Sequence, residues 1–161
     1  MDYKTFNQEL IDYLIRLDKY FEDNNIVPAT LGEKKSFNLT SSDNKCFFSL
    51  DMNRASNIDL KLTIQTRYLN NNQWLIRLDL NGPPHTNPDG TITNRDHIHV
   101  IQEKDSNILN IGYNLDEFDK LLFKHTKNIN KLFKEFCKYC NIEIAGDYQE
   151  VLWGEFYGNF I

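Results

Sequence analysis

The N-terminal segment has the hydrophobic spacing of an amphipathic helix. Apolar residues recur from Phe6 to Phe21 at intervals of four, four, three and four residues, which aligns their side chains along one face of a helix. Charged residues occupy other positions of the same segment. The pattern predicts a helix within residues 1–25 that buries one face.

Downstream of Pro28 the pattern changes to the alternation that is typical of half-buried strands. The apolar positions of four successive segments are Phe37 and Leu39; Cys46, Phe48, Leu50 and Met52; Ile58, Leu60, Leu62 and Ile64; and Trp74, Ile76, Leu78 and Leu80. The breaks between them are rich in Ser, Asp and Asn and are short enough for hairpins. A further strand is expected from Asp96 to Gln102. We therefore predict an antiparallel meander of about five strands within residues 34–103.

The C-terminal part of the chain returns to helical patterning. Asn114 offers an N-cap that is followed by acidic residues in the first turn, and an apolar stripe runs from Ile129 to Cys140. We predict a helical region over residues 114–141. An aromatic tail follows over residues 148–161.

These elements predict an α+β fold in a single domain over residues 1–161. Each element has one apolar face to bury, so the N-terminal helix and the C-terminal helices should pack on one face of the antiparallel sheet. The opposite face of the sheet is then polar. Because alternate residues of a strand share a face, we expect that face to carry Gln65, Arg67, Arg77, Asp79, His97 and His99.

Composition and charge limit the classes of function. Apolar residues make up 40% and charged residues 25% of the chain, as in ordinary globular proteins. The formal net charge of -5 argues against loose binding to nucleic acid and favours basic partners, nucleic-acid-binding proteins among them. There is no signal-peptide pattern, no apolar run of the ~20 residues that span a membrane, and only an odd number of cysteines. We therefore expect a cytoplasmic protein with no membrane partner.

One long connection carries the most distinctive chemistry of the chain. Its sequence Asn87-Pro88-Asp89-Gly90 favours a type I turn, since Asn, Pro and Gly stand at the positions that such a turn prefers. Long connections often carry function. This one is expected to bring His85 back over the sheet towards His97 and His99.

The middle of the chain, from Cys46 to Glu103, combines five short segments, namely Phe48-Ser49-Leu50-Asp51, Gln65-Thr66-Arg67-Tyr68, Arg77-Leu78-Asp79, the run from Pro84 to Gly90, and His97-Ile98-His99. In this combination the chain resembles a family of small uncharacterised bacterial and prophage proteins. The resemblance implies a setting in bacteria and their mobile elements. It implies no activity and no mechanism.

Three interpretations of the histidines stay open. As metal ligands, His97 and His99 together with His85, or with Asp89 in its place, would hold a divalent ion with one position left for water. As acid and base, they would move protons at a phosphodiester, assisted by Arg77 and Asp79. As structural groups, they would hydrogen-bond to carboxylates or backbone carbonyls and fix the loop. The candidate binding residues around them are Gln65, Arg67, Asn87 and Asp89.

The aromatic tail either packs on the fold or binds a partner protein or a second copy of the chain. Aromatic side chains are the usual anchors of such interfaces. The candidate anchors are Trp153, Phe156 and Tyr157. A homodimer is therefore one of the expected assemblies.

Two classes of function follow. In the preferred one, the chain is a phage or mobile-element accessory protein that binds a host protein, for example as an anti-CRISPR-like inhibitor of a nucleic-acid defence enzyme. In the alternative, it is a histidine-centred nuclease or phosphodiesterase that acts on RNA or nucleotides. No cofactor is expected in the first case, and a divalent metal is an option in the second. Binding is preferred because the chain is acidic and shows no complete catalytic signature.

Overall fold

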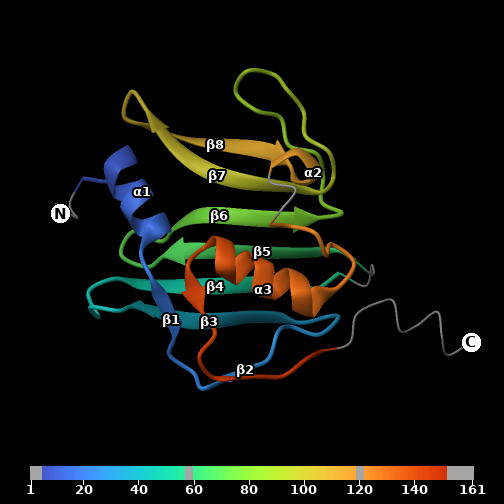
Figure 1. Cartoon of the computed structure of the whole chain (residues 1–161). Helices are drawn as coiled ribbons and strands as arrows, with labels where there is room; N and C mark the ends of the chain where they lie inside the picture. The colour runs from blue at the N-terminus through green and yellow to red at the C-terminus, as the bar shows by residue number, and fades with distance from the viewer. Residues whose placement is uncertain (1–4, 57–59, 119–121, 152–161) are drawn as a thin grey trace, which may run out of the picture.

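An eight-stranded sheet forms the centre of the molecule, as seen in a computed structural model that describes residues 5–56, 60–118 and 122–151 (Figure 1). The strand order is β8-β7-β6-β5-β4-β3-β1-β9. Neighbouring strands are antiparallel, except that β1 and β9 are parallel. The strands are β1 Lys19–Phe21, β3 Lys34–Ser41, β4 Phe47–Asn53, β5 Leu62–Tyr68, β6 Gln73–Leu80, β7 His97–Lys104, β8 Asn107–Asn114 and β9 Ile142–Glu143.

The sheet confirms the predicted α+β fold with a large antiparallel sheet, but the expected number of about five strands is wrong, since the described residues form eight in this sheet. The longest strand that the prediction missed is β8. Asp105 and Ser106 form the turn before it, with φ angles of 51° and 66°. Two successive positive φ angles are typical of a tight hairpin turn. No Gly or Asn-Gly pair marks this turn in the sequence, so the pattern gave little signal for it.

Helix α1 spans Gln8–Arg16 and is shorter than the helical segment predicted within residues 1–25. The Asn7 side chain caps its first turn by accepting a backbone N–H. Phe21, which the spacing placed on the helical stripe, lies on β1 instead and packs on the ring of Phe133 at 6.4 Å between centroids. Phe21 would face the core in a helix as well as in a strand, so the pattern of apolar residues could not distinguish between the two structures at this position.

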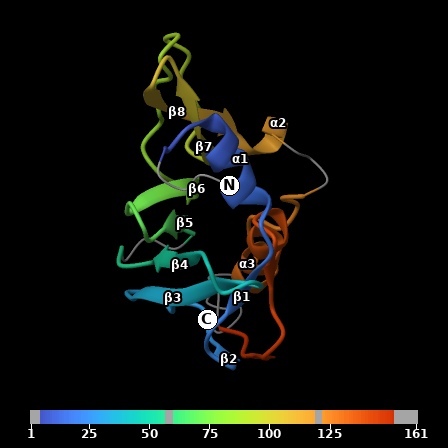
Figure 2. The same ribbon diagram turned by 90° about the vertical axis from the view of Figure 1, so that its left-hand side faces the viewer.

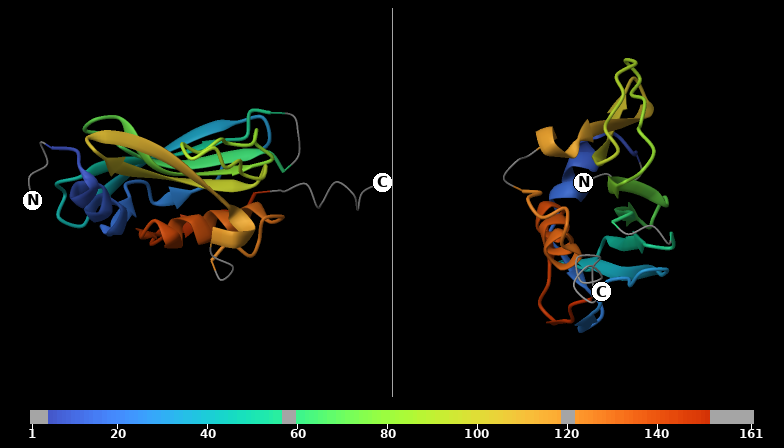
Figure 3. Two further views of the ribbon diagram at one scale, coloured as in Figure 1. Left: turned by 90° about the horizontal axis from the view of Figure 1, so that it is seen from above. Right: turned by 90° about the vertical axis from the view of Figure 1, so that its right-hand side faces the viewer.

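The helical region predicted over residues 114–141 consists of two helices, α2 Leu115–Phe118 and α3 Ile129–Tyr139. Asn114 is the last residue of β8, and its side-chain oxygen accepts the N–H of Asn94 instead of capping α2, whereas Asn128 caps α3. Helices α1 and α3 lie on the same side of the large sheet (Figures 2 and 3). Helix α3 buries the residues Ile129, Leu132, Phe133, Phe136 and Cys137 against it.

A buried lysine joins the ends of the two long helices. Lys19 is 1% exposed, and its ammonium group donates hydrogen bonds to the carbonyl groups of Ile15, Leu17 and Cys140 at 3.1, 2.8 and 3.0 Å. These carbonyls lie at the C-terminal ends of α1 and α3, where cations are favoured. Burial lowers the pKa of Lys19 to about 8.

A β-bulge moves one predicted core residue to the other face of the sheet. Trp74 was expected to alternate with Ile76 and the later apolar residues of its strand. The register between β5 and β6 shifts at Thr66/Arg67, so that Trp74 pairs with Arg67. The Trp74 ring therefore lies on the polar face, 5.9 Å from the ring of His99.

The C-terminal tail is described only as far as Val151. A second, two-stranded parallel sheet pairs β2 Asn25–Ile26 with β10 Asp147–Tyr148, and the Tyr148 ring packs 5.8 Å from that of Phe133. The start of the tail therefore packs on the fold. The candidate anchors that lie outside the described residues are Trp153, Phe156 and Tyr157. None of the helices in the described ranges is long and apolar enough to cross a membrane.

Candidate functional site

The polar face of the sheet brings together a carboxylate and two imidazoles from adjacent strands. Asp79 on β6 pairs directly with His97 on β7, and Arg77 pairs with His99 in the same register. Because paired residues of neighbouring strands share a face, all four side chains project to the same side. The prediction that these residues lie on one polar face agrees with this register.

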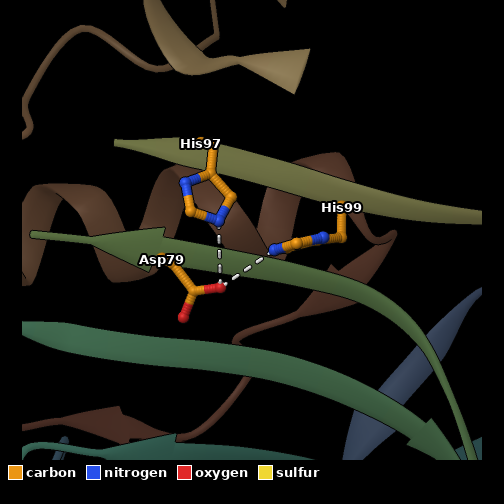
Figure 4. A group of neighbouring side chains, drawn as sticks. All are labelled: Asp79, His97 and His99. Atoms are coloured by element: carbon orange, nitrogen blue, oxygen red, sulfur yellow. Dashed lines mark ion pairs between the residues drawn. The ribbon is translucent and has the colours of Figure 1, made fainter. Parts of the chain in front are cut away.

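The two imidazoles point at the same oxygen of Asp79 (Figure 4). The distance from Asp79 Oδ2 is 3.2 Å to His99 Nε2 and 3.6 Å to His97 Nε2. One ligand atom from each of the three residues lies within 4.8 Å of the others. We call Asp79, His97 and His99 the buried triad, since they are 4%, 2% and 5% exposed.

Further hydrogen bonds hold the Asp79 carboxylate in place. Thr63 donates its hydroxyl to Oδ1 at 2.6 Å, and Arg77 donates Nε–H to Oδ2 at 2.9 Å and Nη2–H to Oδ1 at 3.1 Å. Burial acts to raise the pKa of Asp79, but the hydrogen bonds from His99, Thr63 and Arg77 outweigh it and bring the pKa to about 2. Asp79 is therefore ionised at neutral pH.

The other ring nitrogen of each imidazole in the buried triad also has a partner. His97 Nδ1 lies 2.8 Å from the carbonyl oxygen of Asn94, and His99 Nδ1 lies 2.7 Å from Oδ1 of Asn110. Burial lowers the pKa of His97, so its neutral form is favoured. Asn94 and Asn110 were not predicted as site residues, and neither lies in a sequence pattern that marks it.

His85 reaches the cluster, as its loop was expected to allow, but its bonding nitrogen points elsewhere. Its ring lies 4.7 Å from that of His99. His85 Nε2 is 3.1 Å from the backbone carbonyl oxygen of Asn110 on β8. His85 was predicted as the third ligand beside His97 and His99. In the described structure, Asp79 occupies that position instead.

The loop between β6 and β7 extends past the edge strand β8 (Figure 1) and is held there by side-chain contacts. The Asn87 amide bonds to the backbone of Gly112 on β8. Asp89 accepts hydrogen bonds from the N–H and the hydroxyl of Thr91, and Gly90 has a φ angle of 89°. The Asn-Pro-Asp-Gly turn therefore shapes the loop, and Asp89 bonds within it.

The remaining predicted binding residues form a neighbouring network. Arg67 and Gln65 on β5 each donate a hydrogen bond at 3.0 Å to Oδ2 of Asp51 on β4. A groove of about 390 Å³ lies beside them and is lined in part by Lys34 and Arg77. Asp51 and Thr63 were not predicted as partners. The alternation of strand residues places both on the same sheet face as Gln65, so this pattern could have identified them.

The burial of the triad limits what it can do chemically. Its atoms are enclosed by the sheet and by the loop, whereas the Arg77 side chain is 41% exposed and borders the groove. A substrate of the size of a nucleotide cannot contact buried imidazoles unless the loop moves. The arrangement is able to hold a proton or a small ion without such a movement.

A second hollow lies between the loop and the last part of β8. This cleft has a volume of about 710 Å³ and is lined by Asn87, Asp89, Thr91, Ile92, Thr93, Ile111, Gly112, Tyr113, Asn114, Glu117 and Phe118. Two of these residues are acidic, none is Lys or Arg, and several are apolar. We call this hollow the loop cleft.

Comparisons with known proteins give one family match. The model of a family described as being of unknown function (DUF6978) matches residues 6–142. This match confirms the prediction of an uncharacterised family, while the phage or mobile-element setting stays a prediction. No curated protein matches the chain, and no solved structure matches it.

Proposed function

The chain belongs to this family of unknown function over residues 6–142, and on that premise we propose that it acts by binding a protein partner through the loop cleft. The observation that carries the proposal is the lining of the cleft, which combines carboxylates with the exposed side chain of Ile92 and half-buried apolar side chains and contains no basic residue. The partner that fits this chemistry presents a segment with both basic and apolar side chains.

The apolar part of the cleft is unusually accessible for such side chains. Ile92 at the tip of the loop is 68% exposed, and it faces the same cleft as Tyr113 and Phe118. Exposed apolar groups that are rimmed by polar ones mark interaction sites. The long stems of Lys and Arg can cover apolar surface of this kind while their charged ends reach a carboxylate.

The acidic part of the cleft supplies those carboxylates. Hydrogen bonds from Thr91 lower the pKa of Asp89, which keeps its carboxylate charged. Glu117 on α2 also lines the cleft. The chain as a whole carries a formal net charge of -5. Complementary charge speeds the encounter with a basic partner and selects against acidic ones.

The cleft is built before any partner arrives. Asn87 and His85 bond the loop to the backbone of Gly112 and Asn110 on β8. A wall that is already ordered loses less conformational entropy on binding than a free loop would. This property supports binding in preference to a role as a moving lid over the buried triad.

Enzymes that bind nucleic acid expose many Lys and Arg side chains, because phosphate contacts supply much of their affinity. We therefore keep the proposal that the partner is a host defence enzyme that binds nucleic acid, and that the chain is an accessory protein of a phage or mobile element which inhibits it. The acidic loop cleft is a surface that such an inhibitor would use.

The proposal is tested first with a defined probe. A short labelled peptide that alternates Arg and Leu is titrated into the protein, with a peptide that alternates Glu and Leu as its counterpart. We expect the basic peptide to bind and to shift the backbone NMR signals of Ile92, Gly112 and Glu117. In the double variant Ile92→Ser, Glu117→Gln the affinity should fall about tenfold or more.

The matched control likewise changes one acidic residue and one isoleucine, at the other end of β8. Asp105 lies in the turn before β8 and Ile108 near the start of the strand. Both lie outside the cleft lining, and the double variant Asp105→Asn, Ile108→Ser should bind like the wild type. Equal binding of the two peptides, or equal loss in both double variants, would overturn the proposal. Host proteins captured by the wild type and the control but not by the cleft variant are then the partners to test, with phage survival in expressing cells as the biological readout.

The enzymatic alternative has its own test. Labelled RNA is incubated with the wild type and with the His97→Ala, His99→Ala double variant, each with and without EDTA. We expect no cleavage, because both imidazoles are buried. Cleavage that is lost in the double variant would instead establish the histidine-centred nuclease, and its sensitivity to EDTA would tell whether a metal takes part.

A further inference from the structure

The buried triad directs three electron-pair donors at one point. Oδ2 of Asp79 faces Nε2 of His97 and Nε2 of His99 from adjacent strands. Paired strands of a sheet hold such positions more rigidly than loops do. The sheet itself therefore fixes the positions of these three atoms. An inference about them does not depend on the loop cleft or on the proposed partner.

The hydrogen bonds of the outer ring nitrogens decide which atoms carry protons. His97 Nδ1 faces the carbonyl oxygen of Asn94, which can only accept, so Nδ1 carries the proton. His99 Nδ1 likewise donates to Oδ1 of Asn110. In the metal-free chain His99 can also carry a proton on Nε2 and donate it to Asp79, whereas an Nε2 atom without a proton presents a lone pair. Two lone pairs and a carboxylate oxygen repel one another unless a cation lies between them.

The two distances from Asp79 Oδ2 match a metal ion, and one ligand atom from each of the three residues lies within 4.8 Å of the others. In a tetrahedral zinc site with bonds of about 2.0–2.1 Å, neighbouring ligand atoms lie about 3.3 Å apart. The observed separations of 3.2 Å and 3.6 Å between Asp79 Oδ2 and the two Nε2 atoms lie on either side of that value. A direct hydrogen bond is normally shorter than 3.6 Å, so a proton alone accounts poorly for the position of His97.

We propose that Asp79, His97 and His99 bind a divalent transition-metal ion, with zinc as the first candidate. Two imidazoles and one carboxylate are a ligand set that zinc and non-haem iron both use. The surrounding groups complete the site, because metal-bound histidines usually donate their other N–H to an oxygen. Asn94 and Asn110 provide those oxygens, and Thr63 holds Oδ1 of the carboxylate. The triad thus differs from the set predicted from sequence, in which His85 stood in place of Asp79.

Arg77 controls occupation of this site. Its Nε lies 2.9 Å from the same oxygen, Asp79 Oδ2, that would bind the ion. A guanidinium so close competes electrostatically with a divalent cation. The Arg77 side chain is 41% exposed and can turn into the adjoining groove when a metal binds. Removal of its charge should therefore strengthen metal binding, although Arg77 itself stabilises the metal-free carboxylate.

The experiment titrates zinc into the wild-type protein by calorimetry and follows cobalt as a spectroscopic substitute. We expect one zinc ion per chain and a visible cobalt spectrum of a four-coordinate nitrogen and oxygen site. Asp79→Asn and His99→Gln should each weaken zinc binding about tenfold or more. His125→Gln is the control, because His125 is exposed and pairs with Glu135, and it should bind zinc like the wild type.

Arg77→Gln separates a metal site from a purely structural network. It should bind zinc about tenfold more tightly, whereas Arg67→Gln, which removes a guanidinium paired with Asp51 on the next strand, should change the affinity far less. Circular dichroism checks that each variant is folded. A wild type that binds neither zinc nor cobalt, or an Arg77→Gln variant that binds zinc no better, would overturn the proposal and leave a proton on His99 as the cation of the triad.

Discussion

The side-chain amide of Asn87 forms two hydrogen bonds with the backbone of Gly112. It donates Nδ2–H to the carbonyl oxygen at 2.9 Å and accepts the N–H on Oδ1 at 2.7 Å. Gly112 lies on β8, the edge strand of the large sheet. Asn87 therefore satisfies backbone groups that an edge strand would otherwise offer to another chain. The same contact fixes the loop that covers the buried triad.

Replacement of Asn87 should loosen the loop and reopen the sheet edge. In Asn87→Ala both hydrogen bonds to Gly112 are lost, which we expect to lower the free energy of unfolding by about 1–3 kcal/mol. Hydrogen exchange of the Gly112 amide should speed up strongly. Asn107→Ala is the control, since Asn107 lies at the exposed start of the same strand, and unchanged exchange at Gly112 in Asn87→Ala would contradict this role.

A side chain at position 112 should push the loop off the sheet. A Cβ atom there would lie 2.9 Å from both His85 Cδ2 and Thr93 Cγ2, which is too close for carbon atoms. We expect Gly112→Ala to cost about 1–3 kcal/mol of stability and to weaken the NMR contact between His85 and His99. The double variant Gly112→Ala, Thr93→Ser removes the obstructing methyl group but keeps the hydroxyl that binds the His85 N–H, so it should recover part of the loss. No recovery would show that another contact causes the strain.

Lys19 should matter more to stability than an ordinary surface lysine. Lys19→Met leaves three carbonyl groups at the helix ends, one buried and two partly buried, without their donor, which we expect to cost about 2–4 kcal/mol in chemical denaturation. Lys45→Met changes an exposed lysine and should cost little. Similar losses in both variants would mean that the helix ends do not depend on Lys19.

Asp79 should make stability fall in acid. Its pKa is about 2 in the folded chain, against an ordinary value of 3.8, so folding favours its ionised form. This stabilisation is fully present above about pH 4 and is lost as the pH falls towards 2, an effect of about 2 kcal/mol. Denaturation in EDTA at several pH values measures it without any metal. The slope should be smaller in Asp79→Asn but unchanged in Asp116→Asn, which alters an exposed carboxylate on α2; equal slopes in all three proteins would contradict the assignment.

The face of most candidate residues could be predicted from the sequence, because strand residues alternate between faces. This alternation correctly predicted one shared face for Gln65, Arg67, Asp79, His97 and His99. Trp74 did not, since a bulge between β5 and β6 broke the alternation. Strand β8 was not predicted, because the turn before it lacks the glycine that usually marks a hairpin. Asn110, the partner of His99, lies on this strand and was therefore not predicted either.

The sequence determined that this chain alternates between an apolar and a polar sheet face, that helices cover the apolar one, and that His97 and His99 share a strand face after a loop with a shaped turn. These features follow from local periodicity and turn chemistry, which any short window of residues displays. Only the tertiary structure decided that Asp79 pairs with His97, that Nε2 of His85 turns to Asn110, and that Asn87 docks on Gly112. Strand register and loop docking set those contacts, and both arise from pairings between residues far apart in the chain.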